Sequence, residues 1–200
     1  MDQRTANVAL AGWLAADAVR AVVFVGDFET DLLDGFAGVL FAVTAVFVLR
    51  RASPRAQDAT HGAVAVALAA TMLPAFLAWL APARAAPSSY VVAIQGAAVL
   101  LMGTSLLYLR TNFSIVPQYR TLVTGGPYSL VRHPIYASYL IFDGALVLDA
   151  GSWVGGGLWL AEGCLLLMRA RLEERLLLAS EPAYQTYLAQ VRWRFVPGAV

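Results

Sequence analysis

Residues 125–136 read GGPYSLVRHPIY, and they lie between two strongly apolar stretches of the chain. Arg132, His133 and Pro134 place a dense polar cluster next to a Pro-Tyr turn. Polar groups at membrane depth are costly, and those that persist there usually serve function. Proline is tolerated in the first turn of a helix but not in its interior, so Pro134 predicts a helix start. We therefore expect a functional site where this stretch meets the membrane.

Composition indicates the class of protein around this stretch. The 200 residues are 60% hydrophobic and 14% charged, with a mean hydropathy of +0.66. A soluble domain has about 45–50% apolar and about 25% charged residues, so the composition indicates an integral membrane protein. The net charge of +1 gives no reason to expect a nucleic-acid partner. All 14 basic residues are arginine, which together with the many Ala and Gly residues points to a bacterial inner membrane protein.

The apolar stretches predict an all-α integral membrane fold. A spanning helix needs about 20 mostly apolar residues, which leaves residues 135–168 too long for one span. Asp143, Asp149, Gly151 and the glycines at 155–157 predict a break there, and Cys164 is expected to be buried. The prediction is about five membrane-embedded segments, the last a helical hairpin, followed by a C-terminal cytoplasmic or interfacial helix. The expected segments are 8–26, 32–49, 62–81, 90–109 and the hairpin with arms 135–148 and 152–168.

Charged residues predict the orientation. The loop at 26–34 has acids and no arginine, whereas the loops at 50–58 and 110–134 have three arginines each and the C-terminal tail has five. Arginine-rich loops stay on the cytoplasmic side, so the N-terminus, the loop at 110–134 and the tail are expected there. Within the first span, Asp17 and Arg20 are three residues apart and are expected to neutralise each other.

The tail at 166–190 has a helical pattern that carries a second polar cluster. Arg169 and Glu173 are four residues apart, about one turn, so they share a helix face about 6 Å apart along the axis. Pro182 interrupts this helix, and a second short helix is expected to start there. The tail returns to the membrane face that the hairpin left, so both polar clusters are expected to form one composite site.

For both polar clusters, a role without catalysis or binding is also consistent with the sequence. Arginines and aromatic residues at the start of a cytoplasmic helix are also typical of membrane anchoring. The Glu173-Glu174 pair can equally be a solvated helix face.

The positions of the spans and of the two clusters divide the chain into N-terminal transmembrane helices at 1–110 and a motif region at 111–200.

The motif region resembles a known enzyme family. The string LVTGGPYSLVRHPIY at 122–136 is followed, after the hairpin, by RARLEERLLL at 169–178 and YQTYLAQVRWRFVP at 184–197. This order is similar to that of the isoprenylcysteine carboxyl methyltransferase family and of related membrane phospholipid methyltransferases. Their shared pattern is L-V-T-x-G-x-Y-x-x-x-R-H-P-x-Y, then R-x-x-x-E-E, then Y-x-x-Y near a proline. The resemblance covers residues 105–197, and the first three spans carry no recognised motif.

The resemblance implies an integral membrane methyltransferase that uses S-adenosylmethionine. It implies a lipophilic acceptor, an isoprenylcysteine-like carboxylate or a related lipid, and no metal. The cofactor would be held by the motif loop and the C-terminal helix, in agreement with the lack of a G-x-G-x-x-G motif. The cofactor-binding residues carried over from the family are Gln118, Arg120, Thr121, Leu122, Val123, Tyr128, His133, Pro134, Ile135, Tyr136 and Glu173.

The resemblance also implies roles at the acceptor. Arg169 matches the family's substrate-binding arginine, and a guanidinium can orient a carboxylate at two points. An amine or phenol acceptor would need a general base, for which Glu174 and His133 are the candidates. Arg169 and Glu174 are thus the expected catalytic residues. Ser138, where the family usually has glycine, and Ser180-Glu181, where it has Phe-Gly, depart from the pattern near the acceptor.

A second function is an alternative to the methyltransferase. Membrane sterol or steroid reductases have a similar C-terminal architecture and use NADPH, whose 2′-phosphate needs basic residues such as Arg120, Arg169 and Arg171. A non-catalytic membrane protein is the third class. The expected partners are the lipid bilayer and a lipophilic small-molecule or lipidated acceptor, and the oligomeric state is not predicted.

Overall fold

The structure is a computed structural model. It describes residues 5, 7–12, 14–16, 39–40, 42–80 and 88–198, and only the backbone of residues 74–80. The expected Asp17–Arg20 pair and the acidic loop at 26–34 lie outside the described residues.

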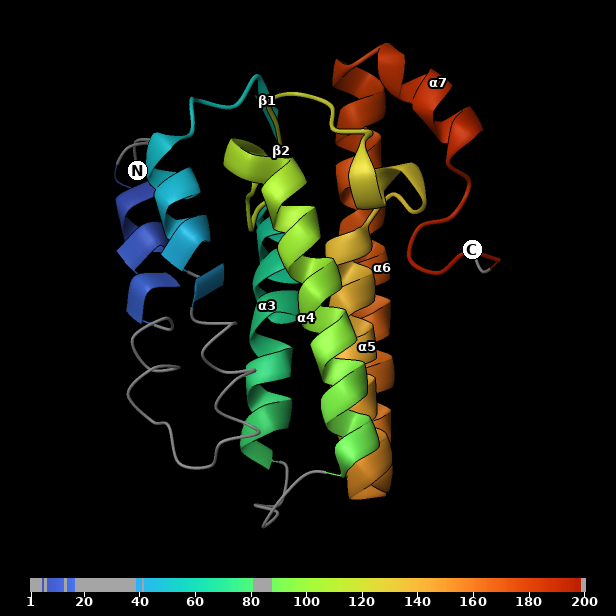
Figure 1. Ribbon diagram of the computed structural model, residues 1–200. Coiled ribbons are helices and arrows are strands. Elements are labelled where there is room, and N and C mark those ends of the chain that lie inside the picture. The colour runs from blue at the N-terminus through green and yellow to red at the C-terminus, as the bar shows by residue number, and fades with distance from the viewer. Residues whose placement is uncertain are drawn as a thin grey trace.

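Four long helices form the body of the described chain (Figure 1). They are α3 (His61–Leu80), α4 (Ser89–Leu109), α5 (Pro134–Ala150) and α6 (Trp153–Ser180). Helix α3 packs against α6, and α4 packs against α5. Residues 7–12 and 42–50 are also helical where the structure describes them. The chain is therefore mostly helical, as its composition and apolar runs predict.

The connections at one end of the bundle carry most of the remaining structure (Figure 1). The strands β1 (Ala56–Gln57) and β2 (Gln118–Tyr119) form an antiparallel pair that the all-α prediction did not include. This pair ties the loop after residue 50 to the motif loop. The other elements are the 3-10 helices η1 (Arg110–Asn112) and η2 (Gly126–Ser129) and the helix α7 (Ala183–Gln190).

The hairpin of α5 and α6 breaks where the sequence predicts, between residues 148 and 152. The first arm runs unbroken through Asp143 to Ala150, and the break lies at Gly151, whose φ of +60° suits a residue without a Cβ. Helix α6 then starts at Trp153, with the Ser152 hydroxyl accepting the Gly155 N–H at 3.1 Å. It continues to Ser180, so the second arm and the first tail helix are one helix. The glycines at 155–157 lie inside it.

The C-terminal break agrees with the prediction at Pro182. Helix α6 ends at Ser180, and α7 begins at Ala183 immediately after the proline. The Glu181 carboxylate accepts the Ala183 N–H at 3.1 Å, which satisfies one free donor of the new helix.

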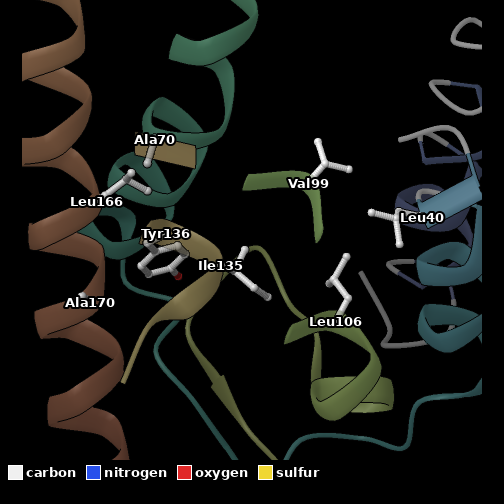
Figure 2. Packing of buried hydrophobic residues seen from close by; sticks show 8 residues of the cluster. All are labelled: Leu40, Ala70, Val99, Leu106, Ile135, Tyr136, Leu166 and Ala170. Carbon is white, nitrogen blue, oxygen red and sulfur yellow. The ribbon is translucent and has the colours of Figure 1, made fainter. Parts of the chain in front are cut away.

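The main hydrophobic core joins all four long helices. Figure 2 shows Ala70 of α3 near Leu166 of α6, with Tyr136 of α5 beside them. Leu166 and Ala170 are completely buried, and the small Ala side chains let neighbouring helices approach closely. The full set of core residues is Leu40, Ala70, Val99, Leu106, Ile135, Tyr136, Leu166 and Ala170. Because the core includes Ile135 and Tyr136, it continues directly into the motif.

One described helix meets the length and apolarity needed to cross a membrane. It covers Ser89–Asn112, with 24 residues and a mean hydropathy of 1.8. The count of about five embedded segments therefore stays a prediction. Cys164 is exposed on α6, contrary to the expectation that it would be buried.

Candidate functional site

A cavity of about 350 Å³ lies where the motif loop meets the long helices. Its apolar lining comes from the N-terminal segments, α3 and α4, with residues such as Leu14, Ala70, Met102 and Leu106. Its polar lining comes from the motif loop, α5 and α6. The cavity therefore combines an apolar wall, drawn mostly from the first half of the chain, with a polar wall drawn from the second.

Glu173 is the carboxylate of the polar wall. The Tyr136 hydroxyl donates to Glu173 Oε1 at 2.5 Å, and Arg169 Nε donates to the same oxygen at 3.3 Å. His133 Nδ1 lies 3.7 Å from Glu173 Oε2. The His133 and Tyr136 rings stack in parallel, 5.2 Å apart, so aromatic faces surround the carboxylate. Such a set suits a cation that is bound in the cavity.

Arg169 links three parts of the fold at the edge of this site. Its NH1 donates to Thr71 Oγ1 of α3 at 3.3 Å, and its NH2 donates to the Ser114 carbonyl at 3.1 Å. Its guanidinium carbon lies 5.1 Å from the centre of the Tyr136 ring. A guanidinium has five N–H donors, so the three hydrogen bonds leave donors for a ligand.

Glu174 lies in a separate cluster of charges. It accepts from Arg132 Nε at 2.8 Å, from Arg194 at 3.0–3.2 Å, and has His133 Nε2 at 3.3 Å. Burial raises the pKa of this carboxyl, but the hydrogen bonds of His133, Arg194 and Arg132 outweigh burial and lower the pKa to about 2. Glu174 is thus held as a carboxylate at neutral pH.

The C-terminal tail covers the motif through backbone hydrogen bonds. The N–H groups of Arg132 and His133 donate to the carbonyls of Trp193 and Arg194 at 2.9 and 2.8 Å. The Phe195 ring meets His133 and Tyr136 edge-on, at 6.1 and 6.2 Å. We call residues 191–195 the C-terminal strap. It fixes the residues on which the Glu173 cluster depends.

The turn before the motif depends on one glycine. Gly126 has a φ of +60°, and a Cβ there would lie 2.5 Å from the Tyr108 ring. The following Tyr128 is buried, and the Tyr187 hydroxyl of α7 donates to its carbonyl at 2.6 Å. Burial, then the charge of Glu173, raises the pKa of the Tyr128 phenol, so its hydroxyl stays protonated.

The structure brings most of the predicted site residues to the cavity. Those that line it are Gln118, Arg120, Thr121, Leu122, Val123, Tyr128, His133, Ile135, Tyr136, Arg169 and Glu173. Pro134 and Glu174 do not line it. Pro134 is the first residue of α5, and Glu174 contacts Arg132, Arg194 and His133. Glu174 therefore holds the motif loop, and its role as a general base stays a prediction.

Sequence reasoning missed several residues of the site. Thr71 carries no motif, and only its contact with Arg169 across the fold reveals it. Tyr139 lies three residues after Tyr136, so helical spacing could have indicated it. Tyr184 and Tyr187, the two tyrosines of the Y-x-x-Y string, were given no place in the site, yet both line the cavity.

Comparison with known proteins adds one structural likeness. No family model and no curated protein matches the sequence. The chain is similar to a solved structure of the eukaryotic intramembrane Ras methyltransferase ICMT (isoprenylcysteine carboxyl methyltransferase). The match has 15% identity and a TM-score of 0.45, and covers 96% of this chain and 75% of that chain. A likeness of that size assigns neither a family nor an activity to this chain.

Proposed function

We propose that the chain is an integral membrane methyltransferase that uses S-adenosylmethionine to methylate a lipophilic acceptor. The observation that carries this proposal is the Glu173 carboxylate, set among aromatic rings on the wall of a cavity whose other wall is apolar. When bound, the cofactor supplies a methyl group on a cationic sulfonium. A carboxylate and the rings of Tyr136 and Tyr128 are suited to such a cation.

The residues of the cavity have distinct roles in this proposal. Methyl transfer is an in-line displacement, so holding the acceptor in line with the methyl group supplies much of the rate. Glu173 and the aromatic rings bind the cationic side of the cofactor. Arg169, fixed by Thr71 and Ser114, orients an acidic acceptor through its remaining donors. The apolar wall accommodates the hydrocarbon part of the acceptor.

The outer face of α4 supports a location in the membrane. Tyr90 and Tyr108 are 56% and 51% exposed and lie about 27 Å apart along the helix, at 1.5 Å per residue. The hydrocarbon core of a bilayer is about 30 Å thick, and tyrosines are enriched at its two borders. Leu100 and Leu107 are exposed between them. We propose that α4 spans a bacterial inner membrane with the cavity at its cytoplasmic side.

Calorimetry on the purified protein tests this function. Both S-adenosylmethionine and S-adenosylhomocysteine should bind wild type, and Glu173→Gln and Tyr128→Ala should each weaken the binding of S-adenosylmethionine by about 1 kcal/mol or more. Arg175→Gln, an exposed residue of the same helix, is the matched control and should leave binding unchanged. Binding of NADPH without binding of S-adenosylhomocysteine would favour the reductase. Arg171, which is exposed and does not line the cavity, gives that alternative no support.

A further inference from the structure

Two buried arginines, Arg51 and Arg120, have no carboxylate partner within the described part of the chain. Their exposed fractions are 8% and 7%. By contrast, the buried Arg132 and Arg169 form ion pairs with Glu174 and Glu173. Buried charges in proteins are normally paired, so this exception requires an explanation.

The hydrogen bonds of both guanidinium groups go to neutral acceptors. Arg51 donates to the Asn7 side chain at 2.7 Å and to the Phe113 carbonyl at 2.8 Å. Arg120 donates from Nε to the Ala52 carbonyl and from NH2 to Gln118 Oε1, each at 2.8 Å. Its third nitrogen, NH1, is buried and has no hydrogen-bond partner among the described residues. One guanidinium nitrogen is thus left unsatisfied in a protein interior, which is rare.

The two positive charges also act on each other. Arg120 binds the carbonyl of Ala52, the residue after Arg51, so the β1–β2 connection brings the two side chains together. Burial, and then the charge of Arg51, lowers the pKa of Arg120 to about 10. Both effects are unfavourable for the charged form, and a nearby anion would relieve both.

We infer that Arg51 and Arg120 form an anion subsite of the cavity, which takes a carboxylate or phosphate group of the bound ligand. Arg120 lines the cavity beside Gln118 and Thr121 and makes the direct contact. Arg51 does not line the cavity and adds the second positive charge behind Arg120. A planar guanidinium suits either oxyanion.

Two ligands carry an anionic group that Arg120 can bind. The amino-acid arm of S-adenosylmethionine carries a carboxylate, and a phospholipid headgroup carries a phosphate. The first source rests on the proposed function, whereas the second does not. The experiment therefore measures both on the full-length protein in lipid nanodiscs.

The first arm compares S-adenosylhomocysteine with 5′-methylthioadenosine, which keeps the adenosine and the thioether but lacks the carboxylate. The second arm compares phosphatidylglycerol with phosphatidylcholine, by the rise in melting temperature that each lipid gives. The variants are Arg120→Gln and Arg51→Gln, and the control is Arg50→Gln, the exposed neighbour of Arg51.

We expect Arg120→Gln to weaken the binding of one anionic probe by about tenfold, and Arg51→Gln to weaken it by less. The binding of 5′-methylthioadenosine to these variants, and the binding of all probes to the Arg50→Gln control, should change little. Loss confined to S-adenosylhomocysteine identifies the carboxylate, and loss confined to phosphatidylglycerol identifies the phosphate. The ligand-free melting temperature of Arg120→Gln should equal or exceed that of wild type, because an uncompensated buried charge has been removed.

The inference is overturned if neither anionic probe distinguishes the two variants from Arg50→Gln. It is also overturned if Arg120→Gln weakens the binding of 5′-methylthioadenosine as much as that of S-adenosylhomocysteine and also lowers the ligand-free melting temperature. Arg120 would then have a structural role only. Arg120→Lys keeps the charge and decides the question if the Gln variant does not fold. If wild type binds no S-adenosylhomocysteine, the proposed function fails, and the phosphatidylglycerol arm still tests the subsite.

Discussion

Glu173 and Glu174 are neighbours in the chain, yet they have different partners. Successive helix residues point about 100° apart, so the two side chains can serve different neighbours. Glu173 lines the cavity, with Tyr136 and Arg169 as its partners. Glu174 points to Arg132, Arg194 and His133 and joins the strap to the motif loop. The sequence alone allowed the Glu173-Glu174 pair to be a solvated helix face. In the structure, the pair links the cavity wall to the motif loop and the C-terminal strap.

The charge cluster around Glu174 predicts a dependence of stability on pH. The pKa of Glu174 is about 2 in the folded protein against an ordinary 4.5. A depressed carboxyl pKa stabilises the fold fully above pH 4.5, and the contribution is lost as the pH falls from about 4.5 towards 2. Glu174→Gln should cost about 2 kcal/mol at pH 7.

Melting temperatures in detergent from pH 7 to pH 3 measure this effect. The gap between wild type and Glu174→Gln should stay constant down to about pH 4.5 and then narrow. A gap that stays constant to pH 3 would show that the variant acts through packing and not through charge.

Arg169 predicts a difference between arginine and lysine. Arg169→Ala should reduce methyl transfer by about tenfold or more and leave the affinity for S-adenosylhomocysteine nearly unchanged. Arg169→Lys should rescue poorly, because one ammonium cannot bind Thr71, Ser114 and an acceptor in a planar arrangement. Turnover and affinity are measured together, with Arg171→Ala on the exposed face as the control. Full activity of the lysine variant would leave Arg169 only an anchoring role.

At the scale of elements, the α5–α6 hairpin contains a buried pair of acids. Asp143 and Glu162 are 7% and 0% exposed and interact across the hairpin. Within the part of the chain that the structure describes, both oxygens of Glu162 lack a hydrogen-bond donor. Carboxylates only accept hydrogen bonds, so these two can bond to each other only when one carries a proton. An amide at either position would supply the missing donor without a proton.

Glu162→Gln is therefore expected to raise the melting temperature at pH 7 by a few degrees, equivalent to about 1 kcal/mol. Glu162→Ala should lower it, because the shorter side chain leaves a cavity in the hairpin. A glutamine variant less stable than wild type would mean that the proton shared by the pair already satisfies both groups.

The elements show what the sequence could and could not predict. Pro134 and Pro182 are local signals, and helices begin at or just after them, as expected. The hairpin break at Gly151 also lies where glycine and the flanking acids predict it, between residues 148 and 152. The contact of Thr71 with Arg169 spans 98 residues, and that of Ala52 with Arg120 spans 68. Such pairings depend on how helices pack, and no local pattern encodes them.

At the scale of the whole molecule, the arginine-rich segments gather at one end. The loop after residue 50, the motif loop and the tail all lie at the end where α5 begins and α6 finishes (Figure 1). The positive-inside rule predicts that this end faces the cytoplasm. Single cysteines on a Cys164→Ser background test the orientation. A membrane-impermeant reagent added outside should label Glu29→Cys and not Ser53→Cys, and the opposite pattern would invert the proposed topology.

The C-terminal strap affects the order in which the site assembles while the protein is synthesised on the ribosome. Arg132 finds its carbonyl partner at Val191, which is synthesised 59 residues later. At about 5–20 residues per second, Arg132 is synthesised roughly 3–12 seconds before Val191. The motif loop is therefore made first and waits for its strap partners. The polar wall of the cavity is completed only after the hairpin helices have been synthesised.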